Sequence, residues 1–297
     1  YGEVPAVQVA SVKATIKGGW LVNEEPRKSA AMSRLQSTLC EISKGGSKYP
    51  KLMTHVVIGY PNLQETEQTI ISMAETGVSF IELQIPFSDP IADGPTIMEA
   101  SRVALENGTK VKDCFALMAR VSRKVDIPLL FMSYYNIVLN YGVEKFCKDA
   151  KAAGVAGVII PDIPPEETKD GFYEACRKYD LDTILILAPI STPDRIEVVG
   201  KTSRGFIYCT ARMSTTGSKA DIPEETKTFL SDLRKKVSLP LSIGFGISKP
   251  EHVRFIKDYA DIIVIGSKVI DIMNESAPKN RQEEVKKFLK SILAECV

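Results

Sequence analysis

Histidine and tryptophan are scarce in this sequence of 297 residues, which has only His55, His252 and a single tryptophan. With so few imidazoles, zinc sites of the common types and histidine-based catalytic triads have almost no candidates. None of the six cysteines forms a C-x-x-C pair. Their wide spacing favours reduced thiols in a cytosolic enzyme over a disulfide framework.

An excess of charge and long apolar runs are also missing. The formal net charge is +1, so the sequence gives no reason to expect nucleic acid or an anionic membrane as a partner. No apolar run approaches the roughly 18 residues of a membrane span, and we expect no secretory signal. What remains, 44% hydrophobic and 25% charged residues, is typical of a soluble globular protein, for which we expect a cytoplasmic location.

Short apolar runs alternate with amphipathic segments after residue 50. Most are nearly continuous in Val, Ile and Leu, as expected for strands buried on both faces. The predicted strands span 52–58, 79–85, 128–132, 157–161, 183–187, 205–209, 239–243 and 261–265. Strands alternating with helices over about 245 residues predict an α/β fold, a (β/α)8 or TIM barrel. The alternative is an open doubly wound sheet, which more often has a glycine-rich fingerprint after its first strand.

Residues 1–31 do not follow this alternation, because their apolar residues have no clear period. We expect them to be an extension or tail of unknown role. A short helix over Ser33–Ser43 would precede the first strand, and residues 32–297 would form one catalytic barrel domain.

Two carboxylates stand near the end of the second predicted strand. Glu82 lies inside the apolar run, where it must be paired, hydrogen-bonded or protonated, because burying a lone charge is costly. Asp93 lies in the following loop, where a helix N-cap or turn role is an alternative. Catalysis in such barrels sits at the carboxyl ends of the strands, so both are candidates for acid–base work. The alternative for Glu82 is a structural carboxylate held by backbone N–H groups.

Glycines and hydroxyls gather after the last three predicted strands. Thr216 and Gly217 belong to a polar loop after the sixth strand, Gly246 follows the seventh, and Gly266 and Ser267 follow the eighth. Glycines let backbone N–H groups approach an anion, and barrels often bind phosphate with the loops after strands seven and eight. The combination predicts a phosphate site, although each glycine alone would also suit a plain turn.

Four further residues are ambiguous from sequence alone. Tyr208, inside the sixth strand, is a site residue or a core aromatic, and His55, in the first, is packing or pocket wall. Arg212 is a phosphate ligand or a solvated loop residue. A Schiff-base aldolase would need a lysine at a strand end, and the nearest candidate, Lys268, is better interpreted as solvated.

Together these motifs resemble those of the tryptophan synthase α subunit family. The segment 86–96, PFSDPIADGPT, resembles the family signature, and blocks at 205–208, 216–217, 244–248 and 266–267 follow in the family's order. The resemblance covers roughly residues 33–295. It implies a TIM-barrel lyase of tryptophan biosynthesis, which cleaves indole-3-glycerol phosphate by a retro-aldol reaction to indole and glyceraldehyde 3-phosphate.

The resemblance also implies a role for each candidate residue. Glu82 would be the shuttling acid–base, Asp93 would accept the indole N–H, and Tyr208 would support the reacting side chain. The phosphate ligands would be Thr216, Gly217, Gly246, Gly266 and Ser267, and the loop from Arg212 to about Glu224 would be a lid. Three features depart from the family pattern. Gln84 stands where many relatives have glycine, His55 stands where they often have phenylalanine, and the lid sequence 212–217 has one glycine where relatives often have a second.

A partner is implied in the same way. The family's α subunit pairs with a pyridoxal-phosphate β subunit that consumes the indole, in an expected α2β2 heterotetramer. The loop of Asp89 and Pro90 would contact that partner, and no cofactor or metal is implied for this chain. Three alternatives stay open: a stand-alone lyase, a non-catalytic subunit that activates β, and another phosphate-binding barrel such as a sugar-phosphate isomerase or aldolase.

Overall fold

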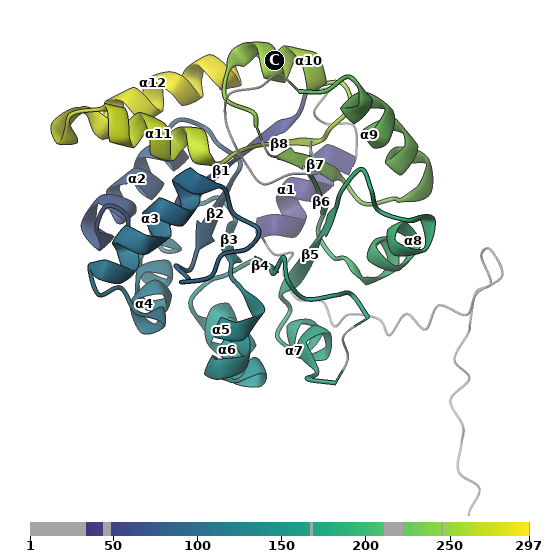
Figure 1. Ribbon diagram of the computed structural model, residues 1–297, viewed down its shortest axis with the longest axis horizontal. Coiled ribbons are helices and arrows are strands. Elements are labelled where there is room, and N and C mark those ends of the chain that lie inside the picture. The colour runs from purple at the N-terminus through teal and green to yellow at the C-terminus, as the bar shows by residue number, and fades with distance from the viewer. Residues whose placement is uncertain (1–33, 44–48, 167–168, 211–221, 245, 297) are drawn as a thin grey trace, which may run out of the picture. The chain divides into compact units, whose positions relative to one another are not determined.

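Eight parallel strands close into a barrel in chain order in the computed structural model (Figure 1). The structure describes residues 34–43, 49–166, 169–210, 222–244 and 246–296. The strands are β1 (Lys51–Val57), β2 (Phe80–Gln84), β3 (Leu129–Met132), β4 (Gly157–Ile159), β5 (Asp182–Leu187), β6 (Ile207–Thr210), β7 (Leu241–Gly244) and β8 (Ile262–Ile265). Strand β8 pairs with β1, which confirms the predicted (β/α)8 barrel and excludes the open sheet.

Helices surround the barrel (Figure 1). They are α1 (Arg34–Ser43), α2 (Leu63–Glu75), α3 (Pro95–Glu106), α4 (Val111–Val121), α5 (Tyr135–Tyr141), α6 (Val143–Ala152), α7 (Phe172–Lys178), α8 (Pro193–Thr202), α9 (Glu225–Lys236), α10 (Pro250–Ile256), α11 (Ser267–Glu275) and α12 (Arg281–Leu293). Within the described ranges, none has the length and apolar character to cross a membrane. The domain boundary predicted between residues 31 and 32 falls outside the described residues.

The two faces of each strand pack in different layers. Along β2, Ile81 and Leu83 face outward and belong to the large core between the barrel and its helices. Phe80 faces inward and packs with Phe206, with the ring centroids 6.1 Å apart. Leu35 of α1 joins this inner cluster. Helix α1 therefore covers the end of the barrel where the strands begin, and the opposite end is left for a site.

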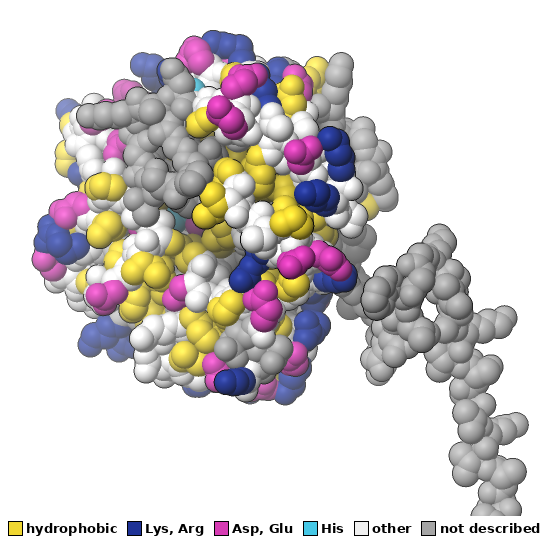
Figure 2. Space-filling view, turned by 45° about the vertical axis from the view of Figure 1, so that its right-hand side comes forward, with side chains coloured by type: hydrophobic (Ala, Val, Ile, Leu, Met, Phe, Trp, Pro, Cys, Tyr) yellow, Lys and Arg dark blue, Asp and Glu magenta, His cyan; other side chains and the backbone are white. Residues whose placement is uncertain are grey.

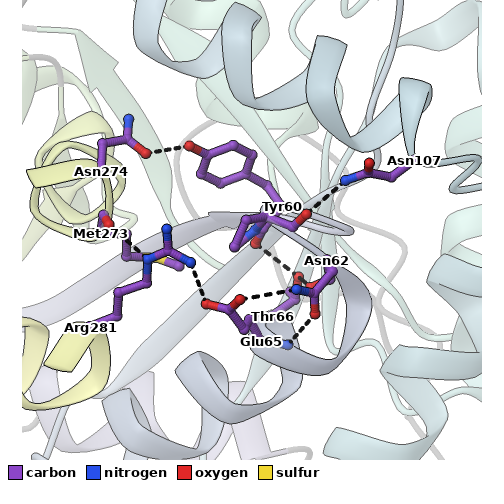
Figure 3. A network of polar contacts seen from close by, with 9 residues as sticks. Tyr60, Asn62, Glu65, Thr66, Asn107, Met273, Asn274 and Arg281 are labelled. Carbon is purple, nitrogen blue, oxygen red and sulfur yellow. Dashed lines mark hydrogen bonds and ion pairs between the residues drawn. The ribbon is translucent and has the colours of Figure 1, made fainter. Parts of the chain in front are cut away.

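A polar network links the first βα unit of the barrel to the last two helices (Figure 3). Arg281, at the start of α12, donates to Glu65 Oε2 of α2 at 2.6 Å and to the Met273 carbonyl oxygen at 2.9 Å. The Tyr60 hydroxyl, after β1, donates to Asn274 Oδ1 of α11. Contacts between elements so far apart in sequence hold the two ends of the fold together where the barrel closes.

Candidate active site

Glu82 is paired with a histidine inside the barrel. The strand register sets His55 of β1 beside Glu82 of β2, and Glu82 Oε1 lies 2.9 Å from His55 Nδ1. The exposed fractions are 5% for Glu82 and 4% for His55. Neither Glu82 Oε2 nor His55 Nε2 has a hydrogen-bond partner among the described residues. The expected pairing of the buried charge thus comes from an imidazole, and one carboxylate oxygen stays open to a ligand.

Asp93 is held by a side chain of β2, the strand that precedes its loop. Gln84 Nε2, at the end of β2, donates to Asp93 Oδ2 at 2.6 Å, and both side chains are buried. The N-cap of α3 is Gly94, so the alternative interpretation of Asp93 as an N-cap is wrong. The amide of Gln84 therefore fixes the orientation of the second carboxylate, which lines the pocket.

The electrostatic surroundings of Asp93 act in opposite directions. Burial raises the pKa of Asp93 above its usual value. The Gln84 hydrogen bond, the charge of His55 and a hydrogen bond from Tyr134 lower that pKa, whereas the charge of Glu82 raises it. Tyr134 also accepts a hydrogen bond from the backbone N–H of Ala92 at 3.1 Å, which fixes the loop that carries Asp93.

Tyr208 faces the two carboxylates from β6. Burial, with the charges of Glu82 and Asp93 adding to it, raises the pKa of Tyr208 well above its usual value, so its hydroxyl stays a neutral donor. Its ring lies over Gly244 of β7, where an added Cβ would meet the Tyr208 hydroxyl at 2.4 Å. The glycine at position 244 is thus what leaves room for the phenol.

One pocket collects these groups at the carboxyl ends of the strands. Its polar lining is His55, Glu82, Asp93, Tyr208 and Ser267, and the remainder is Ala92, Ile97, Met132, Ile159, Pro161, Ile186, Gly246, Ile247 and Gly266. Across the described part of the chain, no group of three or more His, Cys, Asp or Glu residues could hold a metal ion.

Three of the predicted phosphate ligands lie within the described residues. Gly246, Gly266 and Ser267 line the pocket, and Ser267 begins helix α11, whose N-terminus favours negative charge. Thr216, Gly217 and Arg212 lie outside the described residues, as does most of the proposed lid. The structure therefore brings the candidate phosphate ligands after β7 and β8 into one pocket with the two carboxylates.

The predicted partner-contact loop leads away from the pocket lining. Asp89 is exposed and Pro90 is buried, whereas the next residue, Ile91, is 76% exposed. The loop therefore offers a charged and an apolar side chain to the outside while its far end carries Asp93.

Two residues in contact with Asp93 were missed by the sequence interpretation. Gln84 has a recognisable signal, because it lies two residues after Glu82 and a strand points alternate residues to the same face. Tyr134 has a weaker one, since it directly follows the third strand, where catalytic side chains of barrels gather. His55 was expected to be packing or pocket wall, and its contact with Glu82 required the strand register to be known.

Comparison with known proteins gives the same assignment throughout. The sequence model of the family described as "Tryptophan synthase alpha chain" matches residues 44–295. The tryptophan synthase alpha chain of Desulfotalea psychrophila is 46% identical over 77% of this chain and 89% of that protein. That of Caldanaerobacter subterraneus is 38% identical over 88% of this chain and 98% of that protein.

Solved structures give the same result. A tryptophan synthase structure from Mycobacterium tuberculosis superposes with a TM-score of 0.80 at 28% identity, covering 89% of this chain and 98% of that one. A tryptophan synthase subunit alpha from Legionella pneumophila has a TM-score of 0.81 at 26% identity, covering 90% and 99%. On its sequence and its fold, this chain belongs to the tryptophan synthase alpha chain family.

Proposed function

We propose that this chain cleaves indole-3-glycerol phosphate to indole and glyceraldehyde 3-phosphate, as the α subunit of tryptophan synthase. The observation that carries the proposal is a single pocket in which two buried carboxylates, Glu82 and Asp93, lie with the glycine-rich loops of β7 and β8. The carboxylates suit the proton transfers, and the loops suit the phosphate.

Glu82 is the acid–base of the proposed reaction. It protonates the indole carbon that bears the side chain, and it removes the proton from the hydroxyl on the first carbon of that side chain. The bond between the ring carbon and this side-chain carbon then breaks. One proton is given and one is taken, so Glu82 returns to its starting state. Its Oε2, which has no hydrogen-bond partner among the described residues, is the oxygen that this task requires.

Asp93 accepts the indole N–H and stabilises the positive charge that develops on the ring nitrogen. This task needs an ionised carboxylate at a buried position. Burial raises the pKa of Asp93, and the hydrogen bonds from Gln84 and Tyr134 oppose that rise. Asp93 and Glu82 thus take different parts of the reaction because different side chains surround them.

Tyr208 and the glycine loops position the remainder of the substrate. Tyr208 donates a hydrogen bond near the reacting side chain, while N–H groups at Gly246, Gly266 and Ser267 bind the phosphate. Thr216 and Gly217, from the loop after β6, complete the phosphate site in this proposal. The loop from Arg212 to about Glu224 acts as a lid that excludes water.

The partner is a tryptophan synthase β subunit, which carries the pyridoxal phosphate and consumes the indole in an α2β2 assembly. We assign the contact to the loop of Asp89 and Pro90, where the neighbouring Ile91 is 76% exposed. Figure 2 shows apolar side chains gathered towards the middle of the face it presents, with charged side chains among and around them.

Indole release from indole-3-glycerol phosphate, measured with and without a β subunit, tests the proposal. We expect indole from the chain alone and a higher rate with β. Equal rates would identify a stand-alone lyase. No indole under either condition, together with activation of β, would identify a non-catalytic partner subunit.

A further inference from the structure

We propose that His55 and Gln84 are positioning residues for this reaction, each holding one oxygen of one of the two carboxylates. His55 fixes Glu82 through Oε1, and Gln84 fixes Asp93 through Oδ2. The proposal rests on the proposed function, because it assigns these two residues to the lyase site.

The first contact suits a carboxylate that must both give and receive a proton. His55 and Glu82 are paired in the register of β1 and β2, so the contact is fixed by the strands and not by a loop. With its proton on Nδ1, the imidazole donates to Glu82 Oε1 whether Oε2 is protonated or not. The Glu82 side chain therefore keeps one orientation through the proton cycle, and Oε2 is the oxygen that meets the substrate.

The second contact suits a carboxylate that must stay charged. The amide of Gln84 does not titrate, and its Nε2 donates to Asp93 Oδ2 at 2.6 Å in a buried environment. Hydrogen bonds to a charged acceptor are short and strong, and this one opposes the effect of burial on Asp93. Each carboxylate thus has the kind of partner that its proposed task needs.

Both partners come from strand positions that face the barrel interior. Glu82 and Gln84 are two residues apart on β2, and His55 is paired across from Glu82 on β1. His55, Glu82 and Asp93, the partner of Gln84, line the pocket, whereas the intervening Leu83 faces the outer core. His55 on β1 and Gln84 on β2 can therefore be changed to test the two contacts, and Leu83 can be changed to control for damage to β2.

The test uses the full chain and measures kcat and KM for indole-3-glycerol phosphate. His55→Phe keeps an aromatic ring and removes the donor, and Gln84→Met keeps the side-chain length and removes the amide. We expect each to lower kcat by about 10- to 100-fold, the range for losing a hydrogen bond to a charged group. KM is expected to stay within about twofold, because the phosphate loops are untouched.

A rescue variant separates positioning from packing. In His55→Asn the side-chain amide nitrogen takes the place of Nδ1, so most of the lost kcat should return. Leu83→Met changes the outward face of β2 and should leave kcat at the parent value. Thermal stabilisation of every variant by glycerol phosphate shows that the barrel is folded.

The outcomes also separate this inference from the proposed function. A parent protein that forms no indole overturns the proposed function itself. If the parent forms indole and both His55→Phe and Gln84→Met have the kcat of the parent, the positioning roles alone are overturned. The positioning roles are also overturned if His55→Phe and His55→Asn lose kcat equally, or if the variants change only KM.

Discussion

At the scale of single residues, the two buried carboxylates of the pocket differ in what surrounds them. Glu82 contacts the imidazole of His55, whereas Asp93 contacts the amide of Gln84 and the phenol of Tyr134. The two carboxylates therefore have different chemical surroundings, although they are close together in the sequence. This division agrees with a reaction in which one carboxylate moves a proton and the other balances a charge.

Replacing Glu82 by glutamine tests the first of these tasks. Glu82→Gln keeps the shape and removes the acid–base group, so indole formation should fall to background while glycerol phosphate still binds. Measured turnover near the parent rate would refute the assignment of Glu82. The Leu83→Met variant, altered on the opposite face of the strand, is the matched control for strand damage.

Replacing Asp93 by asparagine should have opposite effects on activity and stability. Activity should fall by roughly 10²-fold or more, because the proton-accepting charge is lost. Burial raises the pKa of Asp93 above its ordinary 3.8, so between the folded and unfolded pKa values the folded protein binds more protons than the unfolded chain. Stability contributed by this group therefore falls as pH rises through that window, by ~1.4 kcal/mol for each pH unit that separates the two pKa values.

Asp93→Asn removes that penalty while its amide oxygen can still accept from Gln84. Urea unfolding should find the variant more stable than the parent at pH 7.5. The advantage should shrink as the pH falls towards 4. A variant that is less stable at pH 7.5 would show that the charge of Asp93 is well compensated in the folded state.

At the scale of elements, strand β2 shows how far the sequence carries the argument. Its apolar residues predict a strand, and its alternation predicts that Phe80 and Glu82 share a face. The contact between His55 and Glu82 depends on the register of β1 against β2, which no local pattern specifies. The hydrogen bond from Gln84 to Asp93 depends in addition on the path of the following loop. Local propensity thus identifies the residues, and long-range packing decides which of them meet.

The first and last residues of strands are also difficult to predict from the sequence alone. The apolar pattern predicts the sixth strand from Gly205, but the strand begins at Ile207, because the backbone at Gly205 has a φ of +87° that strands do not adopt. A glycine in the sequence permits that conformation but does not predict it, since many strands also contain glycine. Boundaries of this kind are set by the turn before the strand.

Helix α1 offers a prediction about the closed end of the barrel. Leu35 is fully buried in the inner cluster with Phe80 and Phe206, so Leu35→Ala should leave a cavity there. The expected cost is about 2–5 kcal/mol in the free energy of unfolding, measured with urea. Ser37→Ala, at an exposed position of the same helix, should change that free energy by less than about 0.5 kcal/mol. Equal effects of the two variants would mean that α1 does not pack as described.

At the scale of the whole molecule, substrate binding should link strands from opposite parts of the chain. The pocket joins groups from β1 and β2 to the loops after β7 and β8. A ligand that touches both stabilises the closed barrel, and at 100 times its Kd the gain is about 2.7 kcal/mol. We expect glycerol phosphate to raise the Tm of the full chain, and glycerol at the same concentration to leave it unchanged.

Ser267→Asp distinguishes phosphate binding from a general effect on folding. Ser267 begins α11, where a negative side chain favours the helix dipole but repels a phosphate. The variant should keep the Tm of the free protein and lose the shift with glycerol phosphate. A full shift in Ser267→Asp would place the phosphate elsewhere.

The network around Arg281 has a consequence for how the chain is made. Its hydrogen bond to Glu65 spans 216 positions, and β1 pairs with β8, so the first strand meets its second neighbour only after the other strands of the barrel have been made. Until β8 has emerged from the ribosome, β1 has one edge without its strand, and such edges are prone to pair with other chains. The emergence of β8 thus ends the exposure of that edge, and the hydrogen bonds of Arg281 then join α12 to α2 and α11.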